Sequence, residues 1–131
     1  MVPNPKLNLN ILDGSFTVHR FAADSEIPPA VLAGAFYNIS RSDAELSIVC
    51  DDSIKLDSGK AETGWSCIKV VGPLEFDLTG VLAAMATPLA EAKVSIFAVS
   101  TFDTDYILVK TEKLLLARQV LQAAGHTFGE Q

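Results

Sequence analysis

Two carboxylates, Asp103 and Asp105, lie two residues apart where the sequence predicts a turn between two strands. Carboxylates in a turn can bind a cationic ligand group, but aspartate is also favoured there because it bonds to the local backbone. Gly80 follows Thr79 at the start of a predicted helix. Free backbone N–H groups at a helix start suit an anion, whereas the simpler alternative is a turn glycine. Both alternatives stay open at each position.

The sequence predicts no catalytic or metal centre. His19 and His126 have no second ligand at metal spacing. No nucleophile elbow, dinucleotide fingerprint or phosphate-binding loop is present. We therefore expect no metal, no cofactor and no enzyme activity. Cys50 and Cys67 lie in apolar, strand-like runs, which favours buried reduced thiols; a disulfide and a reactive thiol are the alternatives.

Amino-acid composition and net charge indicate a globular protein and exclude some classes of partner. The 131 residues are 49% hydrophobic, which is enough apolar material for a core. The net charge of −6 argues against nucleic acid and against anionic membranes as partners, because both are bound by basic surfaces. No apolar run is long enough to span a membrane, and residues 1–10 do not resemble a signal peptide. We expect a cytoplasmic location.

The second half of the chain predicts a β-α-β-β-α-β order, the ferredoxin-like arrangement of an antiparallel four-stranded sheet with two helices on one face. Asp77 or Thr79 would cap the first helix, and Pro88 would kink or divide it. Gly125 would end the second helix. The predicted strands are residues 65–71, 94–101, 106–110 and 126–128, and the predicted helices are residues 81–92 and 111–124.

The first half repeats part of this pattern. A shift of about sixty residues aligns residues 35–50 with residues 95–110, so that Asp43 falls on Asp103 and Glu45 on Asp105. A strand at residues 16–21 and a short helix from Pro28 to Leu32 complete the first half, and residues 7–12 are expected to supply its missing strand. We therefore predict two units: residues 1–62, incomplete or permuted with one helix, and residues 63–131, complete.

Four short motifs in residues 76–110 carry a resemblance to a known family. They are Leu-Thr-Gly at 78–80, Pro-Leu-Ala at 88–90, Val-Ser-Ile-Phe at 94–97 and Ser-Thr-Phe-Asp-Thr-Asp at 100–105. This run resembles the ACT-domain group of small bacterial proteins, the CASTOR arginine sensors and the aspartokinase regulatory domains. The resemblance implies an α+β fold of two tandem ferredoxin-like ACT units, the first of them reduced.

The resemblance also implies a ligand site between two units placed side by side. An amino acid there would place its ammonium on Asp105 or Asp103 and its carboxylate on the backbone N–H groups of Gly80 and Val81. Gly80 has no clear counterpart in the first half, so the two halves are not expected to form equivalent sites. The residues expected to bind ligand are Thr79, Gly80, Val81, Thr101, Phe102, Asp103, Thr104 and Asp105 of one unit, and Ser95, Ile96 and Phe97 of the other.

The expected function is therefore regulatory rather than catalytic. The family resemblance implies a sensor that binds an amino acid and changes its association with a partner. Because the resembling sensors carry four ACT units and this chain carries two, we expect a homodimer. The alternative is a structural module that dimerises and binds no ligand.

Overall fold

The computed structural model describes residues 5–72 and 79–129. Contacts between Cα atoms divide the chain into two compact units. We call Gly14–Trp65 the β unit, and Met1–Asp13 with Ser66–Gln131 the αβ unit. The predicted boundary between residues 62 and 63 falls within one long strand. The elements are β1 (Asn8–Ile11), β2 (Phe16–Phe21), η1 (Pro29–Ala33), β3 (Asn38–Arg41), β4 (Leu46–Asp51), β5 (Lys60–Val70), α1 (Val81–Glu91), β6 (Ile96–Ser100), β7 (Asp105–Lys110), η2 (Thr111–Lys113), α2 (Leu114–Ala123) and β8 (Thr127–Phe128).

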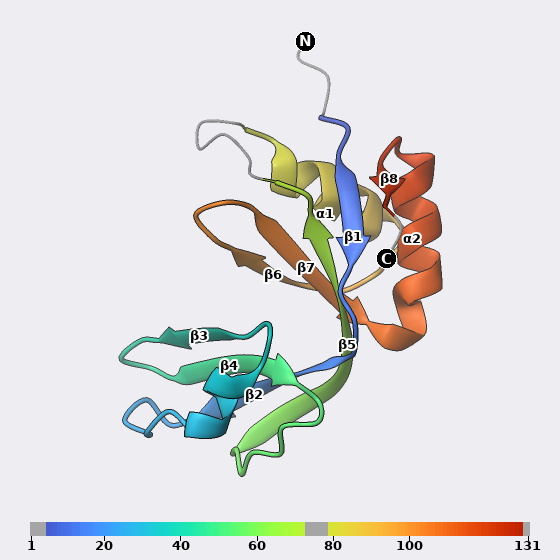
Figure 1. The fold of residues 1–131 in the computed structure, drawn as a ribbon. Helices are drawn as coiled ribbons and strands as arrows, with labels where there is room; N and C mark the ends of the chain where they lie inside the picture. Colours follow the sequence, from blue (N-terminus) through green and yellow to red (C-terminus); the bar gives the residue numbers. More distant parts are fainter. Residues whose placement is uncertain (1–4, 73–78, 130–131) are drawn as a thin grey trace. The chain divides into compact units, whose positions relative to one another are not determined.

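The αβ unit has the predicted α+β, ferredoxin-like arrangement with one strand more than expected (Figure 1). Its described strands follow the order β6-β7-β5-β1-β8. Strand β1 pairs antiparallel with β5 and parallel with β8. The prediction that residues 7–12 complete the first unit is therefore wrong. Leu7 and Leu9 are buried in the core of the αβ unit with Ile68 and Val70, and this burial places the strand there.

Both helices of the αβ unit pack on the same hydrophobic core. The apolar faces that the sequence predicts are confirmed in part. For α1 the predicted face is Leu82, Met85 and Leu89; Met85 and Leu89 are fully buried, but Leu82 is exposed. For α2, Ala117 and Leu121 are fully buried, whereas Leu115 is exposed.

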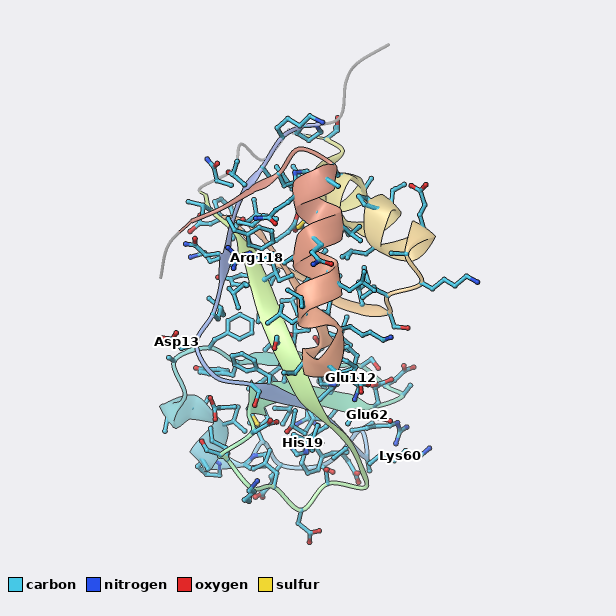
Figure 2. All side chains as sticks on the ribbon, turned by 90° about the vertical axis from the view of Figure 1, so that its right-hand side faces the viewer. Asp13, His19, Lys60, Glu62, Glu112 and Arg118 are labelled. Atoms are coloured by element: carbon cyan, nitrogen blue, oxygen red, sulfur yellow. The ribbon has the colours of Figure 1, made fainter. Side chains whose placement is uncertain are left out.

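Arg118 projects from α2 (Figure 2). Its guanidinium lies 5.0 Å from the ring centroid of Phe128 in β8. This stacking of a cation on an aromatic ring covers the short strand β8 from the helix side.

The first turn of α1 differs from the prediction. Gly80 is the N-cap residue in a left-handed conformation, with φ +80°, and no side chain caps the helix. The hydroxyl of Thr79 is therefore not the predicted cap, and Asp77 lies outside the described residues. Pro88 does not divide α1, which runs without interruption from Val81 to Glu91.

In the β unit, the strand order is β3-β4-β2-β5, where β5 contributes its first residues. The predicted short helix is present as the 3-10 helix η1, with a proline in its first turn. The core of the unit is formed by Val31, Leu46, Ile48 and Cys50. Both cysteines of the chain are free and buried, which confirms the favoured alternative. Burial raises the pKa of Cys67 to about 12, so this thiol is unreactive at neutral pH.

The predicted repeat is confirmed, but its register is not. Arg41 pairs with Leu46, and Ser100 pairs with Asp105, so the two hairpins correspond at a spacing of 59 residues (100 − 41 and 105 − 46). The alignment of Asp43 with Asp103 is therefore off by one residue. A shift of one residue along a strand exchanges its two faces. At the observed spacing Ala44 corresponds to Asp103, so the β unit has no carboxylate there.

No helix among residues 5–72 and 79–129 is long and apolar enough to cross a membrane.

Candidate functional site

A hollow of about 330 Å³ lies in the αβ unit, beside the turn between β6 and β7. Three of the eleven expected ligand residues, Thr101, Asp103 and Thr104, line it. The end of β5 and the start of β7 supply the rest of its wall. The six lining residues are Lys69, Gly72, Thr101, Asp103, Thr104 and Tyr106.

The turn that carries Asp103 is held rigidly. The Thr101 N–H donates to the Thr104 carbonyl oxygen at 2.8 Å, and the Thr101 hydroxyl accepts from the Thr104 N–H at 3.3 Å. Thr104 is buried, and its hydroxyl donates to the Val70 carbonyl oxygen of β5 at 2.7 Å. These bonds connect the turn to the neighbouring strand, so the backbone conformation at Asp103 is fixed.

Two opposite charges face the hollow. Lys69 of β5 places its ammonium 5.9 Å from the ring centroid of Tyr106, and Asp103 contributes a carboxylate from the turn. A lysine, a carboxylate and two hydroxyl-bearing threonines can bind both charged groups of a zwitterion. Sequence reasoning missed Lys69, although it is the one charged residue in the apolar run of residues 65–71.

The other expected residues lie elsewhere in the αβ unit. The carboxylate of Asp105 accepts from the Ser100 hydroxyl at 2.6 Å and is not among the groups that line the hollow. Phe102 is 81% exposed at the tip of the turn. Thr79, Gly80 and Val81 form the start of α1, and Ser95, Ile96 and Phe97 lie at the start of β6. Among the described strands, β6 pairs only with β7.

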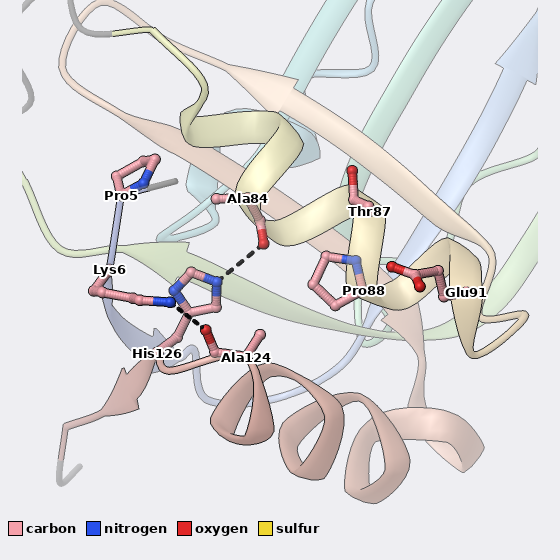
Figure 3. Close-up of a pocket in the computed structure, with 8 residues that line it drawn as sticks. All are labelled: Pro5, Lys6, Ala84, Thr87, Pro88, Glu91, Ala124 and His126. Carbon is pink, nitrogen blue, oxygen red and sulfur yellow. Dashed lines mark hydrogen bonds between the residues drawn. The ribbon is translucent and has the colours of Figure 1, made fainter. Parts of the chain in front are cut away.

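A second cavity of about 230 Å³ lies between α1, the end of α2 and the segment before β1 (Figure 3). It shares no lining residue with the hollow beside the turn. The residues around it are Pro5, Lys6, Ala84, Thr87, Pro88, Glu91, Ala124 and His126.

His126, which is 4% exposed, forms part of this second cavity and joins three segments. Its Nδ1 accepts from the Leu7 N–H at 3.1 Å, so the ring proton is on Nε2. The Nε2–H donates to the Ala84 carbonyl oxygen at 3.0 Å. In a regular helix that carbonyl would accept from residue 88, but Pro88 has no N–H to donate. His126 thus replaces the missing helical bond, which explains why α1 tolerates Pro88.

No group of three or more metal-binding side chains occurs in the part of the chain that the structure describes.

Residues 60–123 match the family model of the ACT domain. The chain contains an ACT domain at these residues. A second family model, described as an N-terminal domain, matches residues 14–55, most of the β unit. The ACT domain therefore includes β5, both α-helices, and the hairpin that borders the hollow.

Relatives and solved structures agree with this assignment. The ACT-domain chain is 32% identical over 130 residues to the "Cytosolic arginine sensor for mTORC1 subunit 1" of Pongo abelii. That match covers 90% of the chain but only 39% of the relative, so the chain spans about two-fifths of its length. The crystal structure of protein Atu0741 from Agrobacterium tumefaciens is 40% identical, with a TM-score of 0.90, and the match covers 97% of this chain and 95% of that one. The aspartate kinase of Clostridium acetobutylicum, 15% identical with a TM-score of 0.69, shares the fold over 95% of this chain and 36% of its own.

Proposed function

We propose that this chain is a regulatory sensor without enzyme activity, which binds an amino acid at an interface between ACT units. The observation that carries the proposal is the pair of opposite charges, Lys69 and Asp103, on one hollow of the ACT domain. A free amino acid has one carboxylate and one ammonium. Lysine binds the first and aspartate the second, in charge-assisted hydrogen bonds that are stronger than neutral ones.

An interface would complete this site. Asp103 is exposed, and an exposed ion pair contributes little free energy because water screens it. A second ACT unit placed over the hollow would exclude water and strengthen both contacts. Strand β6, which pairs only with β7 among the described strands, is the element that we propose for pairing with that second unit. Ile96 and Phe97 are its first residues, and Ser95 directly precedes them. The assembly that follows is a homodimer.

The relatives support an amino-acid ligand. One curated relative is named as a cytosolic arginine sensor, and the chain aligns with part of it. The ligand class comes from that name together with the ACT assignment, and the charge pair fits the α-ammonium and α-carboxylate that all amino acids share. We propose a cytoplasmic location on the same basis.

A thermal-shift screen of the twenty amino acids tests the proposal. A ligand that binds only the folded chain raises its melting temperature. We expect one or a few amino acids to do so, and Asp103→Asn and Lys69→Met each to abolish the rise. Asp105→Asn and Asp43→Asn serve as controls with the same loss of charge outside the hollow. No response to any amino acid, or a full response in both hollow variants, would contradict the proposed site.

The second candidate function is a dimerisation module that binds no ligand. The position of β6, which pairs with a single strand among the described residues, favours it, since strands at the edge of a sheet can pair with another chain. For this candidate, sedimentation would show a dimer and the amino-acid screen would show no response. A charged substitution on the edge, Phe97→Lys, would separate the dimer in either case.

A further inference from the structure

We propose a second small-molecule site in the cavity between α1 and the end of α2, for an elongated molecule with an anionic group at one end and a cationic group at the other. This site shares no residue with the hollow beside the turn, and the proposal does not rest on the function proposed above. In the view of Figure 3, Lys6 and Glu91 lie at opposite ends of the cavity.

Lys6 is exposed, and two contacts direct its side chain toward the end of α2. Its ammonium donates to the Ala124 carbonyl oxygen at 2.9 Å. Its side chain lies directly on the backbone of Gly125, where a Cβ atom would come within 2.9 Å of the lysine Cδ and Nζ. An ammonium has three N–H donors, and one of them is used here. The others can bind a ligand carboxylate, and the contacts already made reduce the side-chain freedom that is lost on binding.

Glu91 forms the acidic end of the cavity. It is the last residue of α1 and makes no ion pair with a described residue. The carbonyl groups at a helix C-terminus add partial negative charge near this position. Thr87 lies one turn earlier on the same face of α1, and its hydroxyl makes no hydrogen bond with a described residue. A cationic group between these two side chains would gain a carboxylate and a hydroxyl as acceptors.

The spacing along α1 indicates the length of the ligand. Ala84 and Glu91 are seven residues apart, which is about 10 Å along a helix axis. Ala84, Pro88 and Pro5 supply apolar surface to the cavity. His126 adds no charge, because its Nδ1 accepts a bond and only Nε2 carries a proton. A chain of methylene groups between two charged ends fits this lining better than a compact zwitterion.

Isothermal titration with four related probes tests this length and charge pattern. The probes are 6-aminohexanoate, which has both charges at the ends of a methylene chain, hexanoate, hexylamine, and glycine, a short zwitterion. We expect 6-aminohexanoate to bind with the highest affinity. The others, which lack one charge or the length, should bind about tenfold more weakly or not at all, since a charge-assisted bond changes affinity by about that factor.

Variants then locate the bound probe. Glu91→Gln and Lys6→Met should each weaken 6-aminohexanoate binding by about tenfold. Glu112→Gln and Lys113→Met are matched charge controls on exposed residues of the same unit and should bind normally. Glu91 is exposed, so its variant is expected to fold, and circular dichroism checks both. The hollow variants Asp103→Asn and Lys69→Met should also bind normally.

Three results would overturn this inference. They are the absence of 6-aminohexanoate binding, equal binding of hexanoate and 6-aminohexanoate, and binding that is lost in the hollow variants but kept in Glu91→Gln. The last result would assign the probe to the amino-acid site. A negative amino-acid screen combined with positive probe binding would instead disprove the first site and support the second.

Discussion

The two units of this chain each bury one histidine, and the two rings are bonded differently. His126 of the αβ unit and His19 of the β unit are both 4% exposed. Both ring nitrogens of His126 have backbone partners. In His19, Nδ1 lies 2.8 Å from the Ser58 hydroxyl, which donates its own proton to Lys60, so Nδ1 must be the donor. Its Nε2 is buried with no partner among the described residues.

The hairpins of the two units differ in a similar way. Both close with the same four-residue turn, in which the N–H of the first residue donates to the carbonyl oxygen of the fourth. The Ser42 N–H donates to Glu45 in the β unit, and the Thr101 N–H donates to Thr104 in the αβ unit. The Ser42 hydroxyl accepts only from N–H groups of its own turn. In the αβ unit, Thr104 also bonds to the neighbouring strand.

The comparison shows that equal burial and equal backbone geometry do not imply an equal role. In the αβ unit, the polar groups connect separate elements, and both cavities adjoin those connections. In the β unit, the Ser42 hydroxyl bonds within its own turn, and Nε2 of His19 has no partner among the described residues. Ligand binding is therefore expected to concentrate in the αβ unit.

The largest expected effect is the contrast between the two histidines. His126→Leu leaves the Leu7 N–H and the Ala84 carbonyl unpaired, and should lower the free energy of unfolding by about 3 kcal/mol. His19→Leu breaks one bond, from Nδ1 to the Ser58 hydroxyl, but it also removes a buried acceptor that has no partner among the described residues, and should change the free energy of unfolding by no more than about 1 kcal/mol. Urea unfolding measures the loss of unfolding free energy in both variants. Similar losses in His126→Leu and His19→Leu would contradict the proposed difference between the two histidines.

A double-mutant cycle tests whether His126 replaces the bond that Pro88 cannot make. Alanine at position 88 restores an N–H that can bond to the Ala84 carbonyl. Pro88→Ala should therefore reduce the cost of His126→Leu by about 1 kcal/mol. His19→Leu combined with Pro88→Ala is the control. In this pair the changes in unfolding free energy of the two single variants should add. Strict additivity in the His126 cycle would refute the replacement.

The two hairpins should respond unequally to loss of a turn hydroxyl. Thr104→Val leaves the buried Val70 carbonyl without this donor, and should cost about 1–2 kcal/mol and weaken amino-acid binding. Ser42→Ala breaks only exposed bonds within its turn and should cost about 0.5 kcal/mol. Chemical denaturation measures the loss of unfolding free energy in each variant. A larger loss for Ser42→Ala than for Thr104→Val would contradict the view that the αβ hairpin is the one bonded to its neighbouring strand.

The smallest effect is a pH dependence from the β unit. Burial lowers the pKa of His19 below its ordinary 6.5, although Asp52 partly opposes the shift. The folded state therefore favours the neutral ring. This contribution to stability is complete above pH about 6.5 and is lost as the pH falls through the lowered pKa. His19→Leu should flatten the change in melting temperature between about pH 7 and pH 5. If the change of melting temperature with pH is the same in His19→Leu as in the unaltered chain, His19 is not the source of the pH dependence.

Asp52 acts at lower pH, so the two groups can be separated. Burial alone would raise its pKa, but bonds from the Ser15 and Thr17 hydroxyls, with smaller effects of the Gly64 N–H and Lys55, hold the pKa below its ordinary 3.8. Its contribution is present above pH about 3.8 and is lost only as the pH falls through the lowered value. The loss from His19 therefore begins near pH 6.5, and the loss from Asp52 begins only near pH 3.8.

The local pattern of apolar and polar residues predicted most of the helices and strands. It did not predict which elements β1 and the end of β5 would lie beside. The apolar spacing of Leu82, Met85 and Leu89 marked α1, and the run at residues 106–110 marked a buried strand. The same pattern could not assign residues 7–12 to a unit, because an alternating strand fits any sheet that offers an apolar face. Nor could it place Lys69 beside Asp103, since these residues meet only when β5 lies next to the β6–β7 turn.

By itself, the sequence determined the ferredoxin-like order, the ACT resemblance and the strand-turn-strand that carries Asp103, since these depend on residue type and short-range periodicity. Tertiary structure alone decided the 59-residue register of the two hairpins, the insertion of β1, and the bond from His126 to the Pro88 turn of α1. Each of these depends on long-range pairing of groups, which burial and hydrogen bonding select and local pattern does not record.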